Sequence, residues 1–379
     1  MDKAEEFAVK LARLRGLMDE RGLSTVALAG EANCAWLGCG PDDGADLARV
    51  VGGRSRIWTE TEGGVAALLV ARDAVYLYAE NIEFPRLTRD EFTGLPFVPL
   101  AHDWRRSDLA RAVDEVASGG AVGYDLLTPA LLDLPGARYL GPEITALRAS
   151  LTPREVERYR WLGEQATIVM GEVCRTIEPG WSEAELHAEA IGRLGQLGID
   201  NAVPIVTCDA RMWLDRHGLY ADNRLERYAM LVFGARKWGL TACVTRLVHF
   251  GPPPDDLARQ LAANRRIARR VIDATRPGVP LAAIFTETLL PAYAAEGYAE
   301  DIALHHQGGS NGYAGRDARV TNQTPGVVQP DQAFAWNPSI TGTKVEDTVV
   351  VGDGGAEVLT ADPRWPVDEE TGLAGMLVR

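Results

Sequence analysis

Two adjacent histidines, His305 and His306, lie in the run LHHQGG and could carry proton-transfer chemistry. The imidazole is the one side chain whose unperturbed pKa lies between pH 5 and 8, so it can act as a general acid or base near neutral pH. If the run is a strand, adjacent side chains point to opposite faces and only one histidine enters a pocket. The glycines that follow, Gly308 and Gly309, are expected to leave room for a ligand beside the backbone. The alternative is a buried histidine that is hydrogen-bonded to a neighbour and has no chemical role.

A lysine and a glutamate are placed two residues apart in the run GTKVEDTVVV. Alternation along a strand puts Lys344 and Glu346 on one face, and Val345 and Asp347 on the other. A lysine beside a glutamate lowers the pKa of the carboxyl group and forms a fixed ion pair. A surface pair is the alternative, but the apolar residues that follow favour a buried strand.

Length and charge limit what the chain can do. Its 379 residues are enough for two domains, and 46% hydrophobic with 24% charged residues is ordinary for a soluble globular protein. The formal net charge is −14, from 39 Lys and Arg against 53 Asp and Glu. Such a surface repels phosphate backbones and no basic stripe offsets it, so nucleic acid is not an expected partner.

The five cysteines are odd in number and show no CxxC spacing, which favours neither a disulfide framework nor a zinc knuckle. The first 22 residues are charged throughout and show no secretory signal, and no apolar run reaches transmembrane length. We therefore expect a cytoplasmic protein without a membrane partner.

The first 147 residues predict an α/β domain. An amphipathic helix is expected over 5–21, a strand over 24–29, a hairpin of strands 65–70 and 74–78, and a short strand over 121–124.

Residues 148–379 predict a second domain that begins with a long helix. Thr152, Pro153 and Glu155 form a capping signature for a helix that runs to about Thr176, and Ser182 and Glu185 repeat it for a second helix. Helices are also expected over 255–275 and from 280 to about 296. The runs CRTIEPGWSEAEL and IDATRPGVPLAAI thus mark an internal duplication of helix, Pro-Gly turn and helix.

The run from Leu304 to Val351 resembles the last third of the creatinase, aminopeptidase P and prolidase family, whose fold is called pita-bread. The first 147 residues are also similar to the family's N-terminal domain. The resemblance implies an α/β (α+β) fold class, with a creatinase-type N-terminal domain and a pseudo-symmetric pita-bread domain. Metal-dependent members hold two divalent ions with two Asp, one His and two Glu. In this chain those positions fall at Val232, Cys243, His306, Asn337 and Glu346, so two of the five ligands remain.

Further pocket residues are implied by the same resemblance. His217 falls near a pocket histidine of the family, although a solvated loop histidine is an equal alternative. Arg246 matches an arginine that follows the second Asp ligand, and Arg316 or Arg319 could clamp a substrate carboxylate. Five residues could contact a ligand: Tyr313, Trp336, Asn337, Lys344 and Cys243. The two aromatic residues and the cysteine could instead be plain core residues.

We therefore expect a metal-independent, cofactor-free enzyme of the creatinase type. It would cleave a C–N or related C–X bond of a small amino-acid-, amide- or guanidino-like substrate, by hydrolysis or elimination. The resemblance assigns His306 as general acid and base, Glu346 as its charge partner or as the base that orients water, and His217 as a second proton-transfer group. Two alternatives stay open: an Xaa-Pro-type metallopeptidase with a reduced metal site, and a non-catalytic binding protein. The family's N-terminal domain is associated with dimerisation, so a homodimer is expected.

Overall fold

The structure of the chain is a computed structural model that describes residues 1–40, 66–127, 129–132, 134, 136–203 and 205–379. It divides into two compact units, Met1–Arg148 and Ala149–Arg379, and the predicted boundary at 147/148 lies one residue away. Among the described helices, none is both long and apolar enough to cross a membrane.

The N-terminal unit is a mixed sheet with the strand order β4-β3-β2-β1-β5-β6. Its strands are β1 Thr25–Leu28, β2 Ala66–Ala71, β3 Val75–Glu80, β4 Phe97–His102, β5 Val122–Tyr124 and β6 Arg138–Tyr139. The predicted hairpin is confirmed, because β2 and β3 pair in antiparallel register from Ala66↔Ala79 to Val70↔Val75. The predicted first helix is α1 Lys3–Arg21. It begins with a capping box formed by Asp2 and Glu5. The other α-helices of this unit are α2 Glu31–Leu37, α4 Phe84–Arg86, α5 Leu109–Ala117, α6 Pro129–Leu132 and α7 Gly141–Ala149.

The C-terminal unit begins with the two helices that the capping signatures predicted. In α8 Pro153–Thr176, Thr152 accepts from the N–H of Glu155 while Glu155 caps Thr152 in return. In α9 Glu183–Gln196, Ser182 and Glu185 make the same reciprocal pair. Each box satisfies two backbone donors that the first turn of a helix leaves free, so these signatures locate helix starts well.

The strands of this unit form two main sheets and a small one. The first sheet has the order β18-β10-β9-β7 with β8 beside β9, and the second has the order β12-β11-β13-β16-β17. The bounds in the first sheet are β7 Asp200–Asn201, β8 Ile205–Cys208, β9 Tyr228–Lys237, β10 Leu240–His249 and β18 Leu377–Val378. Those in the second sheet are β11 Gly308–Asn311, β12 Ala318–Arg319, β13 Ala333–Trp336, β16 Asp347–Gly352 and β17 Gly355–Val358. The small sheet pairs β14 Ser339–Ile340 with β15 Thr343–Lys344.

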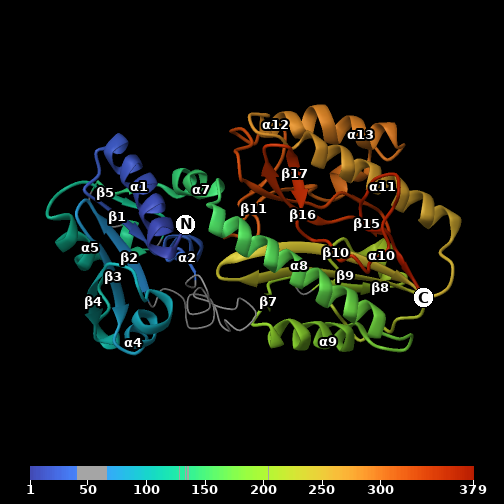
Figure 1. Cartoon of the computed structure of the whole chain (residues 1–379), viewed down its shortest axis with the longest axis horizontal. Helices are drawn as coiled ribbons and strands as arrows, with labels where there is room; N and C mark the ends of the chain where they lie inside the picture. Colours follow the sequence, from blue (N-terminus) through green and yellow to red (C-terminus); the bar gives the residue numbers. More distant parts are fainter. Residues whose placement is uncertain (41–65, 128, 133, 135, 204) are drawn as a thin grey trace. The chain divides into compact units, whose positions relative to one another are not determined.

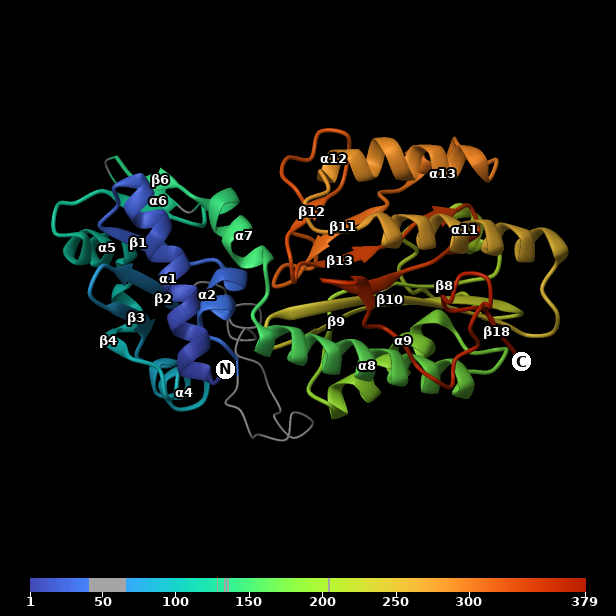
Figure 2. The ribbon, with the colours of Figure 1, turned by 45° about the horizontal axis from the view of Figure 1, so that its top comes forward.

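Helices cover the strands of the C-terminal unit on both sides. In Figures 1 and 2, α8 and α9 lie on one side, while α11 Asp255–Ala274, α12 Leu281–Ala283 and α13 Leu290–Ala295 lie on the other. A short helix, α10 Arg211–Leu214, precedes β9. The apolar faces of the strands and of α11 meet in one core that contains Ile267, Val271, Phe334 and Val349.

The second predicted helix pair is present, but its second member is not one regular helix. A π-helical turn, Ile284–Leu289, separates α12 from α13. Pro291 lies in the first turn of α13 and has no N–H to donate. The regular ladder is interrupted there, and the N–H of Leu290 bonds to the carbonyl of Phe285, five residues before it.

The two glycines of β11 are required by neighbouring backbone, which corrects the expectation that they leave room for a ligand. A Cβ at Gly308 would lie 2.3 Å from the carbonyl oxygen of Ala335, and one at Gly309 would lie 2.0 Å from that of Ala318. Both residues also have positive φ, 108° and 152°. Only glycine therefore allows β12 and β13 to pair with β11 at this point.

We predict that Gly309→Ala lowers the free energy of unfolding by about 2 kcal/mol or more, through backbone strain and the clash with β12. Gly192→Ala is the control, because Gly192 lies in α9 with open space around its Cα. It should raise stability by about 0.5–1 kcal/mol, since alanine is the better helix former. Urea unfolding of both variants measures this, and equal effects would contradict the packing at β11.

Candidate active site

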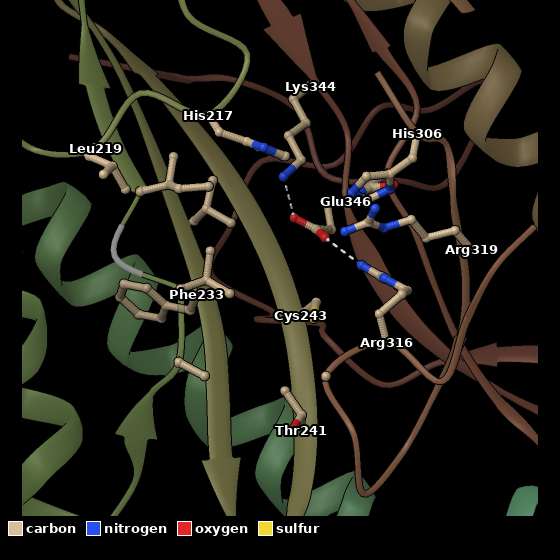
Figure 3. A pocket seen from close by; sticks show the side chains of 16 residues that line it. His217, Leu219, Phe233, Thr241, Cys243, His306, Arg316, Arg319, Lys344 and Glu346 are labelled. Atoms are coloured by element: carbon tan, nitrogen blue, oxygen red, sulfur yellow. Dashed lines mark ion pairs between the residues drawn. The ribbon is translucent and has the colours of Figure 1, made fainter. Parts of the chain in front are cut away.

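A cavity of about 440 Å³ opens in the C-terminal unit between β9, β10 and the segments that flank the second sheet. Apolar side chains form one wall, including Leu219 and Phe233, while charged side chains and imidazoles gather on the opposite side (Figure 3). The polar lining residues are His217, Thr241, Cys243, His306, Arg316, Arg319, Asn337, Lys344 and Glu346.

The β9–β10 hairpin supplies a floor that carries no carboxylate. Val232 pairs with Thr245 and Gly234 pairs with Cys243, so Val232, Cys243 and Thr245 share one face of the hairpin. Val232 and Cys243 line the cavity. The hydroxyl of Thr245 donates to Oε2 of Glu346 at 2.7 Å, which brings the floor into contact with the charged side.

Glu346 is the centre of a buried ion cluster. Its Oε2 lies 2.8 Å from Nζ of Lys344, and its Oε1 lies 3.5 Å from Nη2 of Arg316 (Figure 3). The side chain is 3% exposed. Burial by itself raises the pKa of the Glu346 carboxyl, but Lys344 and Arg316 outweigh burial and hold that pKa below its usual value. The carboxylate therefore stays ionised at neutral pH, and the predicted shared face of Lys344 and Glu346 is confirmed.

Arg246 and Asp347 form a separate pair outside this cavity. Nη2 of Arg246 lies 3.0 Å from Oδ1 of Asp347 and also donates to the carbonyl oxygen of Thr360. Both side chains are 3% exposed. Arg246 was expected to bind substrate, but the structure places its guanidinium against Asp347, the first residue of β16, and not in the lining of the cavity.

Three histidines come together beside the cluster. Nε2 of His305 lies 2.8 Å from Nε2 of His217, and the rings of His305 and His306 are stacked with centroids 4.5 Å apart. The strand expected at His305 and His306 is therefore wrong, although only one of the two, His306, lines the cavity, as expected. The two residues follow a short 3-10 turn, Asp301–Leu304, and precede β11 instead of lying in it, so strand alternation does not apply.

All three imidazoles have pKa values below the ordinary one. Burial and the nearby Arg316 lower the pKa of His306 to about 4, and burial and Lys344 lower that of His305 to about 2. The pKa of His217 is also lowered, chiefly by burial. At neutral pH the three rings are neutral, so each has a nitrogen lone pair that can accept a proton or a hydrogen bond.

Asn337 brings an unused acceptor to the cavity. Its backbone N–H donates to the carbonyl oxygen of Gln307 at 3.0 Å, which fixes the residue directly after β13. The side chain is 2% exposed, and its Oδ1 has no hydrogen-bond partner among the described residues. A ligand N–H would satisfy this atom, since a buried acceptor without a partner is costly.

Tyr313 and Trp336 are core residues and do not line the cavity. The hydroxyl of Tyr313 donates to Oε1 of Glu155 at 2.5 Å, next to the start of α8. The ring of Trp336 stacks on Phe334 at 5.5 Å within the hydrophobic core. The plain-core alternative therefore describes both, because each side chain is buried and neither reaches the cavity.

The residues at the family's metal positions do not fit a pair of hard divalent ions, which need several carboxylate oxygens. Val232 has no donor atom, Asn337 is neutral, and burial raises the pKa of the Cys243 thiol to about 11. The one carboxylate, Glu346, is already paired with two cations. Ligand atoms of His217, His305 and His306 lie within 4.8 Å of one another. That group contains no carboxylate, and Lys344 and Arg319 lie close enough to affect its titration.

Some residues of the cavity and its surroundings were not identified from the sequence. Thr245, which contacts Glu346 from outside the lining, was detectable because it lies two residues after Cys243 on the same face of β10. Leu219 lies in the segment between α10 and β9, where no periodicity marks which residues point inward. His305 was missed because a strand was expected at its position.

Comparisons with known proteins agree with this fold. The sequence pattern described as metallopeptidase family M24 matches residues 157–353. An ectoine hydrolase from Halomonas elongata is 21% identical over 408 residues, which cover 95% of this chain and 96% of that protein.

Solved structures extend the likeness to the whole chain. An Xaa-Pro dipeptidase from Bacillus anthracis gives a TM-score of 0.77 at 19% identity, covering 98% of this chain and all of that one. A prolidase from Thermococcus sibiricus gives a TM-score of 0.78 at 17% identity, covering 100% of both chains. Because the family pattern spans more than half of the sequence and the fold matches along its length, the chain belongs to metallopeptidase family M24, the pita-bread family of creatinase, aminopeptidase P and prolidase.

Proposed function

We propose that this chain is a metal-independent hydrolase that cleaves a C–N bond in a small amide-, guanidino- or amino-acid-like substrate. The observation that carries the proposal is the state of Glu346, whose carboxylate is bound by an ammonium and a guanidinium within the cavity. In a two-metal hydrolase such a carboxylate would be free to bind an ion. The relative from Halomonas elongata is named an ectoine hydrolase, which supports hydrolysis over elimination.

Proton transfer in this proposal belongs to His306, with His217 as the second group. A neutral His306 accepts a proton from a water molecule as the water oxygen bonds to the substrate carbon. The C–N bond then breaks, and the departing nitrogen takes a proton from the imidazolium. His306 is suited to the first step because it lines the cavity and is neutral, and its buried Nδ1 has no partner among the described residues.

Glu346 acts as a charge partner in this scheme. The family resemblance implied two possible roles for Glu346, a charge partner or the base that orients water. The second role requires a carboxylate that is free to take a proton. Both oxygens of Glu346 are engaged, by Lys344 and Thr245 on one and by Arg316 on the other.

The lining supports a substrate that carries a negative charge and an N–H group. Lys344, Arg316 and Arg319 bring three positive charges to the cavity against the one negative charge of Glu346. Arg319 is exposed, and the described residues give it no carboxylate partner, so it can clamp a carboxylate. Asn337 Oδ1 would accept from the N–H, and Leu219 and Phe233 would pack on the apolar part. A cavity of about 440 Å³ fits a small molecule.

The second candidate is an Xaa-Pro-type metallopeptidase with a reduced metal site. The fold likeness to a dipeptidase and a prolidase favours it. The donor set argues against it, because Val232, Cys243 and Asn337 stand at three of the four carboxylate positions and Lys344 engages the fourth, Glu346.

The metal content of the purified protein separates these candidates. We expect well under one equivalent of manganese, cobalt or zinc by elemental analysis, and activity that persists after dialysis against a chelator. The reason is that one paired carboxylate cannot hold two hard cations. Stoichiometric metal together with activity lost on chelation would instead establish the metallopeptidase.

His306→Ala tests the proton-transfer role. We expect turnover to fall by roughly 10²–10⁴, the usual contribution of a general acid or base, with little change in melting temperature. His187→Ala is the matched control, because His187 is a partly buried histidine of α9 that stacks on Tyr220 and does not line the cavity. A His306 variant that loses stability but keeps its turnover per folded molecule would show a structural histidine, and full activity would refute the role.

We also propose that the protein is a homodimer, because its N-terminal unit resembles a domain associated with pairing in this family, and two-fold dimers are the commonest soluble oligomers. Light scattering should give twice the chain mass of 41.1 kDa at micromolar concentration. A mass of one chain would contradict the proposal.

A further inference from the structure

The most unusual feature of the cavity is a lysine ammonium at the carboxylate where the family places a metal ligand. Building on the proposed function, we infer that Lys344, supported by Arg316, performs the electrostatic task of the missing metals. It holds the Glu346 carboxylate in place and stabilises the negative charge that develops on the substrate during hydrolysis. Lys344 is thereby a catalytic residue of this chain and not only part of a structural ion pair.

The position of the ammonium suits this task. Lys344 ends the short strand β15 and reaches the cavity, where Nζ lies 2.8 Å from Oε2 of Glu346. The side chain is only 6% exposed, so its charge is weakly screened by solvent. An ammonium has three N–H donors, and Glu346 needs one of them. The others are available to a group in the cavity.

Arg316 completes the replacement from the other side of the carboxylate. Its Nη2 lies 3.5 Å from Oε1 of Glu346, and its Nη1 donates to the carbonyl oxygen of Ala335 at 2.6 Å. The guanidinium is thus fixed by β13 while it faces Glu346. Two protein cations surround one carboxylate in a chain whose net charge is −14, which makes the cavity a local positive region in an acidic protein.

The chemical step balances without a metal. As the water oxygen bonds to the substrate carbon and its proton passes to His306, the π electrons of the attacked C=O or C=N bond move to the oxygen or nitrogen. The Lys344 ammonium donates a hydrogen bond to that atom while the negative charge is present. The double bond then re-forms, the C–N bond breaks, and His306 returns the proton to the leaving nitrogen. Donors fixed in advance at a developing charge are usually the largest catalytic contribution.

A binding experiment that needs no substrate tests the replacement. If the ammonium occupies the role of a cation, its removal leaves Oε2 of Glu346 without its cationic partner, so that this oxygen can bind a metal ion together with His306 and Asn337 of the same cavity. We expect Lys344→Met to bind Mn²⁺ at least about tenfold more tightly than wild type, a change of about 1.4 kcal/mol. The electron paramagnetic resonance signal of free Mn²⁺ measures the binding directly, and circular dichroism confirms the fold.

Two further variants make the comparison specific. Lys344→Arg keeps the charge and should bind Mn²⁺ no better than wild type. Arg319→Gln removes an exposed cavity charge for which no contact with Glu346 is found, so it should change the affinity by less than about threefold, because solvent screens exposed charges. The inference that Lys344 takes the place of a metal ion is overturned if Lys344→Met gains no more affinity for Mn²⁺ than Arg319→Gln. Lys344→Gln serves the same test if the Met variant does not fold.

The catalytic part is tested by turnover of the substrate that the proposed function predicts. Lys344→Met should lower kcat by about 10²–10³ with a smaller change in KM, and Lys344→Arg should restore part of the loss. Unchanged kcat in Lys344→Met would overturn the catalytic role. Stoichiometric metal in the wild-type protein would instead sink the proposed function, so the two failures are distinguishable.

Discussion

The buried carboxylate of Glu346 is the interaction on which the rest of the site depends. A charge that is 3% exposed is stable only when it is paired and hydrogen-bonded, and Lys344, Arg316 and Thr245 provide those contacts. The same residue joins the two main sheets, because Thr245 of β10 donates its N–H to the carbonyl oxygen of Glu346 at 3.2 Å. Glu346 therefore carries the buried charge on its side chain and links β10 to the segment before β16 through its backbone.

The positive charges have a second effect, on the histidines. Arg316, Arg319 and Lys344 reinforce burial in disfavouring the imidazolium forms of His306 and His217. These fixed cations therefore help to keep the rings neutral, so that each ring retains a nitrogen lone pair. The same cations thus pair with the Glu346 carboxylate and lower the pKa of the neighbouring His306 imidazole.

Much of the fold followed from local rules that do not depend on distant parts of the chain. The capping boxes at Thr152 and Ser182 located the starts of α8 and α9, and alternation placed Lys344 with Glu346.

Predictions that needed tertiary information were less successful. Arg246 and Trp336 lie close to pocket positions in the sequence, but one side chain is held by Asp347 and the other is buried in the core. His305 and His306 were placed on opposite faces because a strand was assumed to begin at His305, three residues before β11 begins. Gly308 and Gly309 suggested space for a ligand, whereas the space is filled by β12 and β13.

The central claim is that a protein cation, and not a metal ion, neutralises Glu346. X-ray diffraction from crystals soaked in Mn²⁺, with data collected at a wavelength where manganese scatters anomalously, tests it most directly. We expect continuous density for the Lys344 side chain up to Oε2 of Glu346 and no anomalous peak beside that carboxylate. An anomalous peak bound by Glu346, with Lys344 turned away from it, would show that a metal ion is the natural partner of this carboxylate.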